Sequence, residues 1–480
     1  MRLSIWRTGP VGGNKMRVLL IYPDTDPLSI VPHRLINIEP LALEYLAAAI
    51  PNHDVQILDM KTDHHLDYSL EKFRPDIVGI TGTVIHTYRI YEILRQIKKW
   101  NPQIMTIVGG TQATLVPRDF DRPQVDFVAI GHGVDSFHQI VDNHEMGRSY
   151  LEIENIAFRH NGQFHINPQR PLLNLDSFPL PRRDLTDRNR NNYFHLVWRP
   201  TALIITSVGC SYHCNFCPCP VLTQGKYLKR SPELVLRELL EIKEKYIYAG
   251  DDNLFFDYKH AFRIYELLKE AGLKKEYYIL SRIDEINRHP DLVEKWAKIG
   301  LKKVFLGLET FRDDELNLLN KRSTVENNNR AISILQANKI DPLGAFIIQP
   351  YYTQKDFDSL LRYMDRMKIY YHEFTVLTPF PGTDFYNKVK NQMLYSDYRL
   401  FDLAHSLFPT AVPVQEFHRL LSRLYRRALS PARAIRIRPA VSPFHHLRFI
   451  RLIPGLFSLF KNGRHAFAAL RGVSRNPQRD

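Results

Sequence analysis

Short apolar runs alternate with amphipathic stretches through the first 150 residues. Residues 40–50 and 88–99 have the density of Leu, Ala and Ile expected of packed helices. The compact apolar runs around them predict β-strands at residues 16–22, 55–58, 76–81, 105–108 and 126–130. Because short apolar strands that alternate with helices are typical of a parallel sheet covered on both faces, we expect a doubly wound, Rossmann-like α/β domain over residues 16–150.

A second series of strands and helices occupies residues 201–400. Its predicted strands are residues 202–206, 246–248, 277–280, 303–306, 344–348 and 373–377, and its predicted helices include 232–245, 258–271 and 290–299. About six such units suit a parallel barrel, here a partial (β/α)6 barrel of the TIM type. In such barrels the chemistry lies at the carboxyl ends of the strands, so the functional residues are sought there.

Three segments fall outside these two series. Residues 151–200 are rich in Pro, Asn and Arg and are predicted to be a linker. Residues 1–15 form a short polar extension, so that Met16 competes with Met1 as the start of the chain. Residues 401–480 are expected to form a small helical region, helical over 400–430 and followed by a basic tail.

Composition excludes several classes of protein. The chain has 480 residues, 44% of them apolar, which is ordinary for a globular protein and unlike a disordered or collagen-like chain. It has four cysteines, too few for a disulfide-rich secreted scaffold. No apolar run reaches the roughly 18 residues that a membrane-spanning helix needs. Without a secretory signal and with clustered cysteines, we expect a cytoplasmic protein.

The net charge of +14 is uneven. Residues 431–480 hold ten Lys or Arg and one acid, so their net charge is +9 and that of the first 430 residues is +5. The tail interleaves Arg with apolar residues, which suits peripheral contact with an anionic membrane surface. A pair of solvated or core-capping helices explains the same pattern, and prolines 439, 443 and 454 interrupt any long helix.

The four cysteines lie within ten residues. Cys210, Cys214 and Cys217 have the spacing C-x3-C-x2-C on a loop that follows a predicted strand. Three thiolates from one short loop can hold three irons of a [4Fe–4S] cluster and leave the fourth iron open. Zinc is the alternative, but no second pair of ligands is evident. Cys219 falls outside the spacing and is predicted to be a bystander.

This loop resembles that of the radical S-adenosylmethionine superfamily, whose pattern is C-x3-C-x-aromatic-C, with Phe216 in the aromatic place. The resemblance implies that Cys210, Cys214 and Cys217 bind the cluster and that Phe216 lies near the adenine. Further along the chain it implies three groups of contacts with S-adenosylmethionine. They are Asp251 and Asp252 at the amino group, Ser281 and Arg282 at the carboxylate, and Glu309 near the ribose.

Glycine and threonine clusters follow three strands of the first domain. They can be tight turns, or they can let a bulky ligand approach the backbone. The region resembles the cobalamin-binding domain joined to one class of radical S-adenosylmethionine enzymes, which implies cobalamin contacts at Thr81, Gly82, Thr83, Gly109, Gly110, Thr111, Gly131, His132 and Gly133. The D-x-H-x-x-G motif is missing, so a histidine ligand to cobalt from that motif is not predicted.

Together these resemblances imply a [4Fe–4S] cluster, S-adenosylmethionine and cobalamin as cofactors. They imply a methyltransferase that places a methyl group on an unactivated carbon of a lipid or natural product, since residues 401–427 look similar to the end of hopanoid C-3 methylases. The alternatives are an oxidative cyclase of tetrapyrrole type and a tRNA-modifying enzyme. Expected partners are a small-molecule or lipid substrate and an electron donor such as flavodoxin or ferredoxin. DNA is not expected, and no RNA-binding module is recognised.

Overall fold

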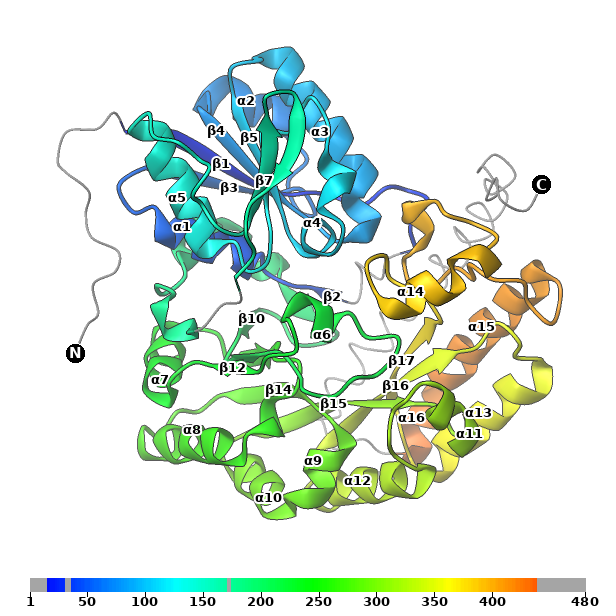
Figure 1. Cartoon of the computed structure of the whole chain (residues 1–480). Helices are drawn as coiled ribbons and strands as arrows, with labels where there is room; N and C mark the ends of the chain where they lie inside the picture. Colours follow the sequence, from blue (N-terminus) through cyan, green and yellow to red (C-terminus); the bar gives the residue numbers. More distant parts are fainter. Residues whose placement is uncertain (1–14, 31–35, 171–173, 438–480) are drawn as a thin grey trace. The chain divides into compact units, whose positions relative to one another are not determined.

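The computed structural model describes residues 15–30, 36–170 and 174–437 (Figure 1). It divides into two compact units, which are described separately. The N-terminal unit contains the chain up to Asp26 with Glu39–Asn192 and Val221–Leu228, and the C-terminal unit contains Pro27–Ile38, Tyr193–Pro220 and the chain from Lys229. The predicted extension, apart from Lys15, and the tail beyond Ile437 lie outside the described residues.

The N-terminal unit is built on a seven-stranded sheet with the order β3-β1-β4-β5-β6-β7-β8. Five strands are parallel: β3 (Asp54–Asp59), β1 (Arg17–Tyr22), β4 (Ile77–Thr81), β5 (Met105–Gly109) and β6 (Phe127–Ala129). This order places the topological switch point between β1 and β4. Ligands of doubly wound sheets bind beyond the carboxyl ends of strands at such a point.

Helices cover both faces of this sheet. On one face, α1 (Leu41–Ala49) and α5 (Val134–Glu145) pack on one set of alternating strand residues, including Val18 and Leu20. On the other face, α2 (Leu66–Phe73), α3 (Thr87–Trp100) and α4 (Thr111–Leu115) pack on the intervening set. The doubly wound α/β fold predicted for this region is therefore confirmed.

The segment predicted to be a linker is an integral part of this unit. Strands β7 (Ile156–His160) and β8 (Gln163–Ile166) form an antiparallel hairpin that extends the sheet beyond β6. Ile156 and Ala157 are fully buried. The free energy gained by burying these apolar side chains stabilises the hairpin, although the residues around it are mostly polar. The prediction of a linker over 151–200 is thus corrected, as is the expectation of a purely parallel sheet.

Ion pairs hold the end of the same segment against the rest of the N-terminal unit. A run of 3-10 helix, η4 (Arg183–Asn192), supplies Arg183 and Arg190 to the buried carboxylate of Glu39. Glu44, also fully buried, accepts a hydrogen bond from Thr186 at 2.6 Å. Buried carboxylates need such partners, so this part of the segment is fixed in place.

The C-terminal unit is a curled half-barrel of six parallel strands in chain order (Figure 1). The strands are β10 (Thr201–Ile204), β13 (Tyr246–Ala249), β14 (Glu276–Ser281), β15 (Leu301–Glu309), β16 (Asp341–Ile348) and β17 (Tyr371–Val376). The outer helices are α7 (Pro232–Glu241), α8 (Tyr258–Glu270), α10 (Pro290–Lys298), α12 (Val325–Ala337), α13 (Gln354–Arg366) and α15 (Val414–Ala428). The predicted (β/α)6 partial barrel is confirmed. Shorter helices α9 (Ile283–Arg288), α11 (Asp313–Leu318) and α14 (Asp384–Val389) complete the connections.

The predicted helix over 400–430 is correct only from Val414 onward. Before it, Asp402 organises an irregular loop by accepting hydrogen bonds from the amides of Ala404 and His405, each at 2.9 Å. Pro409 and Pro413 cannot donate within a helix, which explains the late start of α15. After it, α16 (Pro431–Ile437) ends the described chain.

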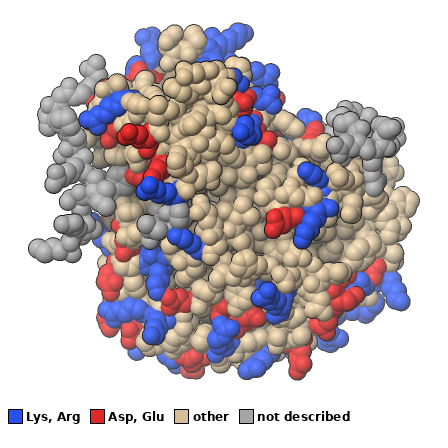
Figure 2. All heavy atoms as spheres, viewed as in Figure 1, with Lys and Arg blue, Asp and Glu red and all other residues tan. Residues whose placement is uncertain are grey.

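Two surface properties bear on partners. No helix in the described part of the chain is long and apolar enough to cross a membrane. On the face shown in Figure 2, Lys and Arg are interspersed with Asp and Glu, in agreement with the small net charge of the first 430 residues.

Candidate active site

The cysteine loop lies at the carboxyl end of β10, where a parallel barrel places its chemistry. After β11 (Ser207–Val208) the chain turns through Cys210, Cys214 and Cys217, whose side chains are half-buried. The loop ends at Cys219, the buried first residue of the short helix α6 (Cys219–Leu222). No disulfide links the four cysteines.

Hydrogen bonds from a distant segment hold this loop in shape. The amide nitrogen of Asn215 donates to the Leu319 carbonyl at 3.3 Å, and its Nδ2 donates to the Leu318 carbonyl at 2.9 Å. In return, Nδ2 of Asn320 donates to the His213 carbonyl at 2.7 Å. The segment that contains Leu318–Asn320 thus clamps the cysteine loop between Cys210 and Cys217.

Two neighbouring carboxylates fix the start of the loop. Oδ2 of Asp252 accepts the amide of Gly209 at 2.7 Å. Asp251 is fully buried and accepts from the Thr206 amide at 2.8 Å, the Thr206 hydroxyl at 2.5 Å and the Ser207 hydroxyl at 2.6 Å. Both residues were predicted to contact S-adenosylmethionine, but the structure uses the Asp251 carboxylate to tie β13 to the end of β10.

Arg282 places a positive charge beside the cysteines. Its Nη1 donates to Sγ of Cys214 at 3.3 Å, and its guanidinium lies 3.7 Å from the ring centroid of Tyr212. Its Nε donates to Asp284 at 2.9 Å, which holds the planar group in this orientation. Arg282 thus directs its positive charge at one of the three cysteines predicted to bind the cluster.

Cys219 contacts one of the three predicted ligands. A hydrogen bond from Cys219 lowers the pKa of the Cys217 thiol, and the same bond followed by burial raises the pKa of Cys219. The bond therefore keeps the proton on Cys219 and favours the thiolate at Cys217. The prediction that Cys219 is a bystander to metal binding stays a prediction, but this thiol is a direct neighbour of the site.

The spacing of the sulfur atoms bears on which metal centre fits. A single tetrahedral zinc ion at about 2.3 Å from each sulfur would bring the sulfurs within about 4 Å of one another. Among the described residues, the one group of three His, Cys, Asp or Glu ligand atoms within 4.8 Å of one another is His53, Asp142 and Glu145, and it contains no cysteine. The thiols of Cys210, Cys214 and Cys217 are therefore not all within 4.8 Å of one another, as a single zinc ion would require, and a multi-iron cluster remains the centre that their spacing in the sequence predicts.

Glu309 and Lys321 form a buried ion pair at the end of β15. Nζ of Lys321 donates to Oε1 of Glu309 at 2.5 Å, and the two residues are 4% and 7% exposed. Glu309 has a φ of +61°, at an irregularity in the pairing of β15 with β16. A Cβ on Gly307 would lie 2.8 Å from Nζ of Lys321 and closer still to Oε1 of Glu309, so only glycine leaves room for the pair. No role was predicted for Lys321, since no local pattern shows that it pairs with Glu309, which lies twelve positions earlier.

Within the described chain, Asn253 has a hydrogen-bond donor without a partner at the carboxyl edge of the half-barrel. Its Oδ1 accepts from the Arg282 amide at 3.0 Å and lies 3.4 Å from the Ser281 hydroxyl, while its buried Nδ2 has no partner among the described residues. A buried donor left unpaired is costly, so its place at this edge fits the binding of S-adenosylmethionine. Ser281 and Arg282 lie here as predicted, whereas half-buried Phe216 has no aromatic contact with a described residue.

The glycine loops of the N-terminal unit separate into a packed pair and an open pair. Gly110 has a φ of +97°, and a Cβ there would lie 2.5 Å from the Gly82 carbonyl oxygen and 2.7 Å from Oγ1 of Thr81. Packing alone therefore explains Gly82 and Gly110. Around Gly131 nothing lies within 4 Å of a Cβ position, and around Gly133 the nearest atom is at 3.9 Å. The open backbone of this second loop is the part that suits a bulky ligand.

The other predicted loop residues take local roles. Thr83 caps the turn η1 (Val84–His86), where its hydroxyl lies 3.0 Å from Nδ1 of buried His86. Gly109 ends β5 and Thr111 begins α4. His132 is exposed, and its ring centroid lies 6.2 Å from that of Phe178. Their contacts with cobalamin stay predictions. The loop at Thr83 follows β4, which borders the switch point of the sheet, and the other loops follow β5 and β6 beyond it.

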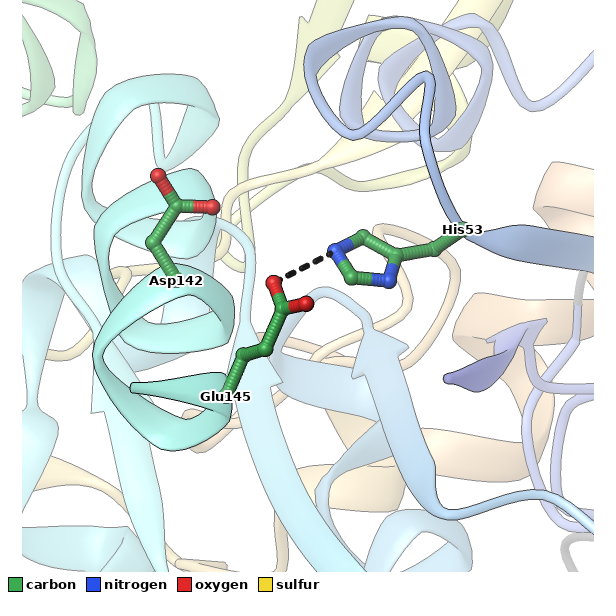
Figure 3. Close-up of side chains that lie close together, drawn as sticks. All are labelled: His53, Asp142 and Glu145. Atoms are coloured by element: carbon green, nitrogen blue, oxygen red, sulfur yellow. Dashed lines mark ion pairs between the residues drawn. The ribbon is translucent and has the colours of Figure 1, made fainter. Parts of the chain in front are cut away.

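A second cluster of possible ligands lies at the opposite edge of that sheet. Figure 3 shows His53, before β3, with Asp142 and Glu145 from the end of α5, and Nε2 of His53 lies 3.8 Å from Oε2 of Glu145. The Met16 amide donates to Nδ1 of His53 at 3.3 Å, so a neutral ring carries its proton on Nε2. That nitrogen points at Glu145 and has no lone pair for a metal, so we interpret the cluster as structural.

Two family models match the chain. The radical SAM superfamily matches residues 204–364, and the B12 binding domain matches residues 31–141. The chain is similar to hopanoid C-3 methylase of Methylococcus capsulatus, with 29% identity over 84% of this chain and 78% of the relative. It is also similar to an uncharacterized methyltransferase of Pyrococcus horikoshii, with 29% identity over 93% of this chain and 99% of the relative.

Solved structures share the fold of the whole described chain. The radical S-adenosylmethionine methyltransferase TsrM of Kitasatospora setae, solved with cobalamin and a [4Fe–4S] cluster bound, has a TM-score of 0.65 and 14% identity over 95% of this chain and all of its own. The cobalamin-dependent enzyme OxsB has a TM-score of 0.64 and 17% identity over 86% of this chain and 62% of its own. At these identities the likeness shows the fold alone.

Proposed function

We propose that the chain is a cobalamin-dependent radical S-adenosylmethionine enzyme, because residues 31–141 match the B12 binding domain and residues 204–364 match the radical SAM superfamily. From that premise we propose that it is a methyltransferase that acts on an unactivated carbon of an apolar lipid, similar to a hopanoid. When bound, the cluster and S-adenosylmethionine supply a carbon radical, and cobalamin supplies the methyl group. Such chemistry reaches carbons that have no nucleophilic lone pair.

The observation that carries the proposal is the arrangement of charge around the cysteine loop. The loop is clamped by Asn215 and Asn320, and Arg282 donates to Cys214. Asn253 and the Glu309–Lys321 pair lie at the carboxyl edge of the same half-barrel and would hold S-adenosylmethionine. The protein thereby positions the cluster and its ligand, and positioning is what a protein contributes to cofactor chemistry.

The substrate class rests on two observations. One is the 29% identity to a protein named hopanoid C-3 methylase over most of both chains. The other is the apolar and aromatic wall inside the half-barrel, which includes Leu280 and Phe305. A polycyclic or long-chain hydrocarbon suits such a wall, since its burial is favoured by about 25 cal/mol per Å².

Partners and location are part of the proposal. An electron donor such as flavodoxin or ferredoxin supplies the reducing electron, and we place the enzyme in the cytoplasm at the membrane surface. At the start of the basic tail, Ile435 is 73% exposed and the side chain of Arg436 is 63% exposed, as expected of a peripheral lipid contact. Arg433 is buried and donates to Asp365, the Ala428 carbonyl and the Ile369 carbonyl, so it has a structural role.

Two measurements test the proposed function. Anaerobic reconstitution should give a protein with four irons and one cobalamin per chain that forms 5'-deoxyadenosine. Lipid extracts of a deletion strain and its parent should differ by one methyl group on an apolar lipid. A difference by a ring closure would instead indicate a cyclase, and zinc-loaded protein without iron would refute the cluster.

A further inference from the structure

Each strand of the half-barrel presents alternate residues to its two faces. One set packs under the outer helices in a single apolar core: Ala202, Ile204, Ile247, Ala249, Tyr277, Ile279, Val304, Leu306, Leu308, Phe346, Ile348, Phe374 and Val376. Because side chains alternate along a strand, the intervening residues point to the other side, which we call the inner face. Several of these, among them Tyr248, Leu280, Phe305 and Glu373, are only half-buried.

Strand register orders the inner face into rows. Nearest the amino ends of β15 and β16, Lys303 pairs with Asp341 and with Tyr278. The next row contains Leu280, Phe305, Leu343 and Tyr371, which are apolar or aromatic. These residues form an apolar wall across four strands.

The row above contains Gly307, Ala345 and Glu373, side by side on β15, β16 and β17. The Glu309 carboxylate and Nζ of Lys321 occupy the space that a Cβ on Gly307 would take, so Glu373 shares this row with the ion pair. Glu309, which folds back over Gly307, borders the same row. The carboxyl group of Glu373 therefore lies between the apolar wall and the residues expected to hold S-adenosylmethionine.

The amino end of the inner face is closed. Trp198 is fully buried, and Nζ of Lys303 lies 4.4 Å from its ring centroid and 5.0 Å from that of Tyr371. His195 stacks on Tyr278 with ring centroids 4.3 Å apart. Since aromatic groups fill this end, a ligand on the inner face must lie toward the carboxyl ends, beside Glu373.

Glu373 has no protein partner. Within the described residues it makes no hydrogen bond and no ion pair, whereas Glu309 on the same face is paired with Lys321. Burial, and next the charge of Glu309, raises the pKa of Glu373, so the group holds its proton to higher pH than an ordinary carboxyl. A carboxyl group that is only half-buried and has no protein partner among the described residues is available to a ligand.

We propose that Glu373 is a substrate-binding residue, whose carboxyl group hydrogen-bonds to a neutral oxygen, such as a hydroxyl, on an otherwise apolar substrate held against the inner face of the half-barrel. This inference rests on the proposed function and specifies its substrate class as an oxygenated apolar lipid. A cationic substrate is the rival, because aromatic rings and a carboxylate also receive amines. A substitution that removes the charge of Glu373 but keeps a side chain able to hydrogen-bond distinguishes a neutral substrate from a cationic one.

The experiment compares Glu373→Gln with Glu373→Leu. Holoprotein with S-adenosylhomocysteine is incubated with the neutral-lipid extract of the producing cells and then washed. The molecules that the protein retains are measured by mass spectrometry. We expect wild type and Glu373→Gln to retain the same oxygenated apolar compound, and Glu373→Leu to retain at least tenfold less. The matched control is Glu276→Leu on β14. In the wild type the Glu276 carboxylate is paired with Lys245 at 2.7 Å, and its loss should leave retention of the compound unchanged.

Stability distinguishes binding from a structural role. If Glu373 is kept for a ligand, Glu373→Leu should unfold at the same or a higher temperature than wild type while it loses retention. Equal retention by Glu373→Leu, or no retention by wild type, would overturn the inference. Equal loss in Glu373→Gln would show that a charge is required and would also overturn it. If retention follows the prediction but the deletion strain lacks no methyl group, the proposed methyl transfer fails and the binding site stands.

Discussion

The carboxyl edge of the half-barrel and the glycine loops of the N-terminal unit present different groups to their ligands: side chains at the first, and backbone at the second. At the half-barrel, charged and amide side chains hold one another: Arg282 donates to Cys214, Lys321 pairs with Glu309, and Asp251 ties two strands together. At the glycine loops the backbone itself is exposed, as at Gly131 and Gly133. The first site should therefore be sensitive to the loss of individual side chains, and the second to the gain of a Cβ.

The largest effect that tests this comparison is at the cysteine loop. Cys210→Ala, Cys214→Ala and Cys217→Ala should each abolish cluster binding and 5'-deoxyadenosine formation, because a [4Fe–4S] cluster held by three thiolates loses an iron ligand. The measurement is iron and sulfide content with product formation. Cys219→Ala is the matched control and should keep the cluster, whereas an inactive Cys219→Ala would show that the ligand set is wrong.

The next largest effect is at the buried ion pair. Lys321→Met leaves the Glu309 carboxylate buried without a cation, which should cost about 3–5 kcal/mol of folding free energy and weaken S-adenosylmethionine binding. Chemical denaturation and equilibrium binding measure the two effects. The double variant Glu309→Gln with Lys321→Met should recover part of the stability but not the affinity. Unchanged affinity in both variants would remove the pair from the cofactor site.

A pair of glycine substitutions tests the other side of the comparison. Gly110→Ala should destabilise the protein by about 2–4 kcal/mol, because the added Cβ meets the Gly82 carbonyl and the φ of +97° is strained. Gly131→Ala, at a φ of +79° in open space, should cost only about 1 kcal/mol yet weaken cobalamin binding. Thermal unfolding and cobalamin titration separate the two. Tight cobalamin binding by Gly131→Ala would argue against this loop as the binding surface.

A further test of the half-barrel edge is a pH dependence of stability at Asp251. Burial raises the pKa of this carboxyl to about 6, above its unfolded value near 4, so the folded state holds the proton more tightly. Its stabilising contribution is full below pH 4 and is lost as the pH rises through 6. Relative to Asp251→Asn, wild type should lose about 2–3 kcal/mol between pH 4 and pH 6 in denaturant unfolding. A constant difference over this range would contradict the buried, protonated carboxyl.

Local patterns in the sequence predicted most of the fold. Apolar runs such as 105–108 correspond to strands within one or two residues, and the cysteine spacing identified the loop at the end of β10. The hairpin of β7 and β8 was missed because its polar surroundings resemble a linker, although Ile156 is fully buried. The irregular loop over 400–413 was also missed, since Asp402 accepts from the nearby amides of Ala404 and His405 in a turn that replaces the expected helix.

Long-range contacts at the site could not be predicted. The orientation of the Asp251 carboxylate toward Thr206 and Ser207 depends on how two strands meet, and no local pattern encodes it. Lys321 and Asn253 acquire their importance from partners that only the folded chain brings near.

The clamp on the cysteine loop also sets an order of events during protein synthesis. Asn215 bonds to a carbonyl 103 positions later in the chain, and His213 accepts from an amide 107 positions later. At roughly 5–20 residues per second, on the order of 5–20 s pass between the emergence of the cysteines and that of the segment that shapes them. The cysteine loop is therefore not held in shape until more than half of the half-barrel has been synthesised. We expect iron and sulfide to be inserted only after that step.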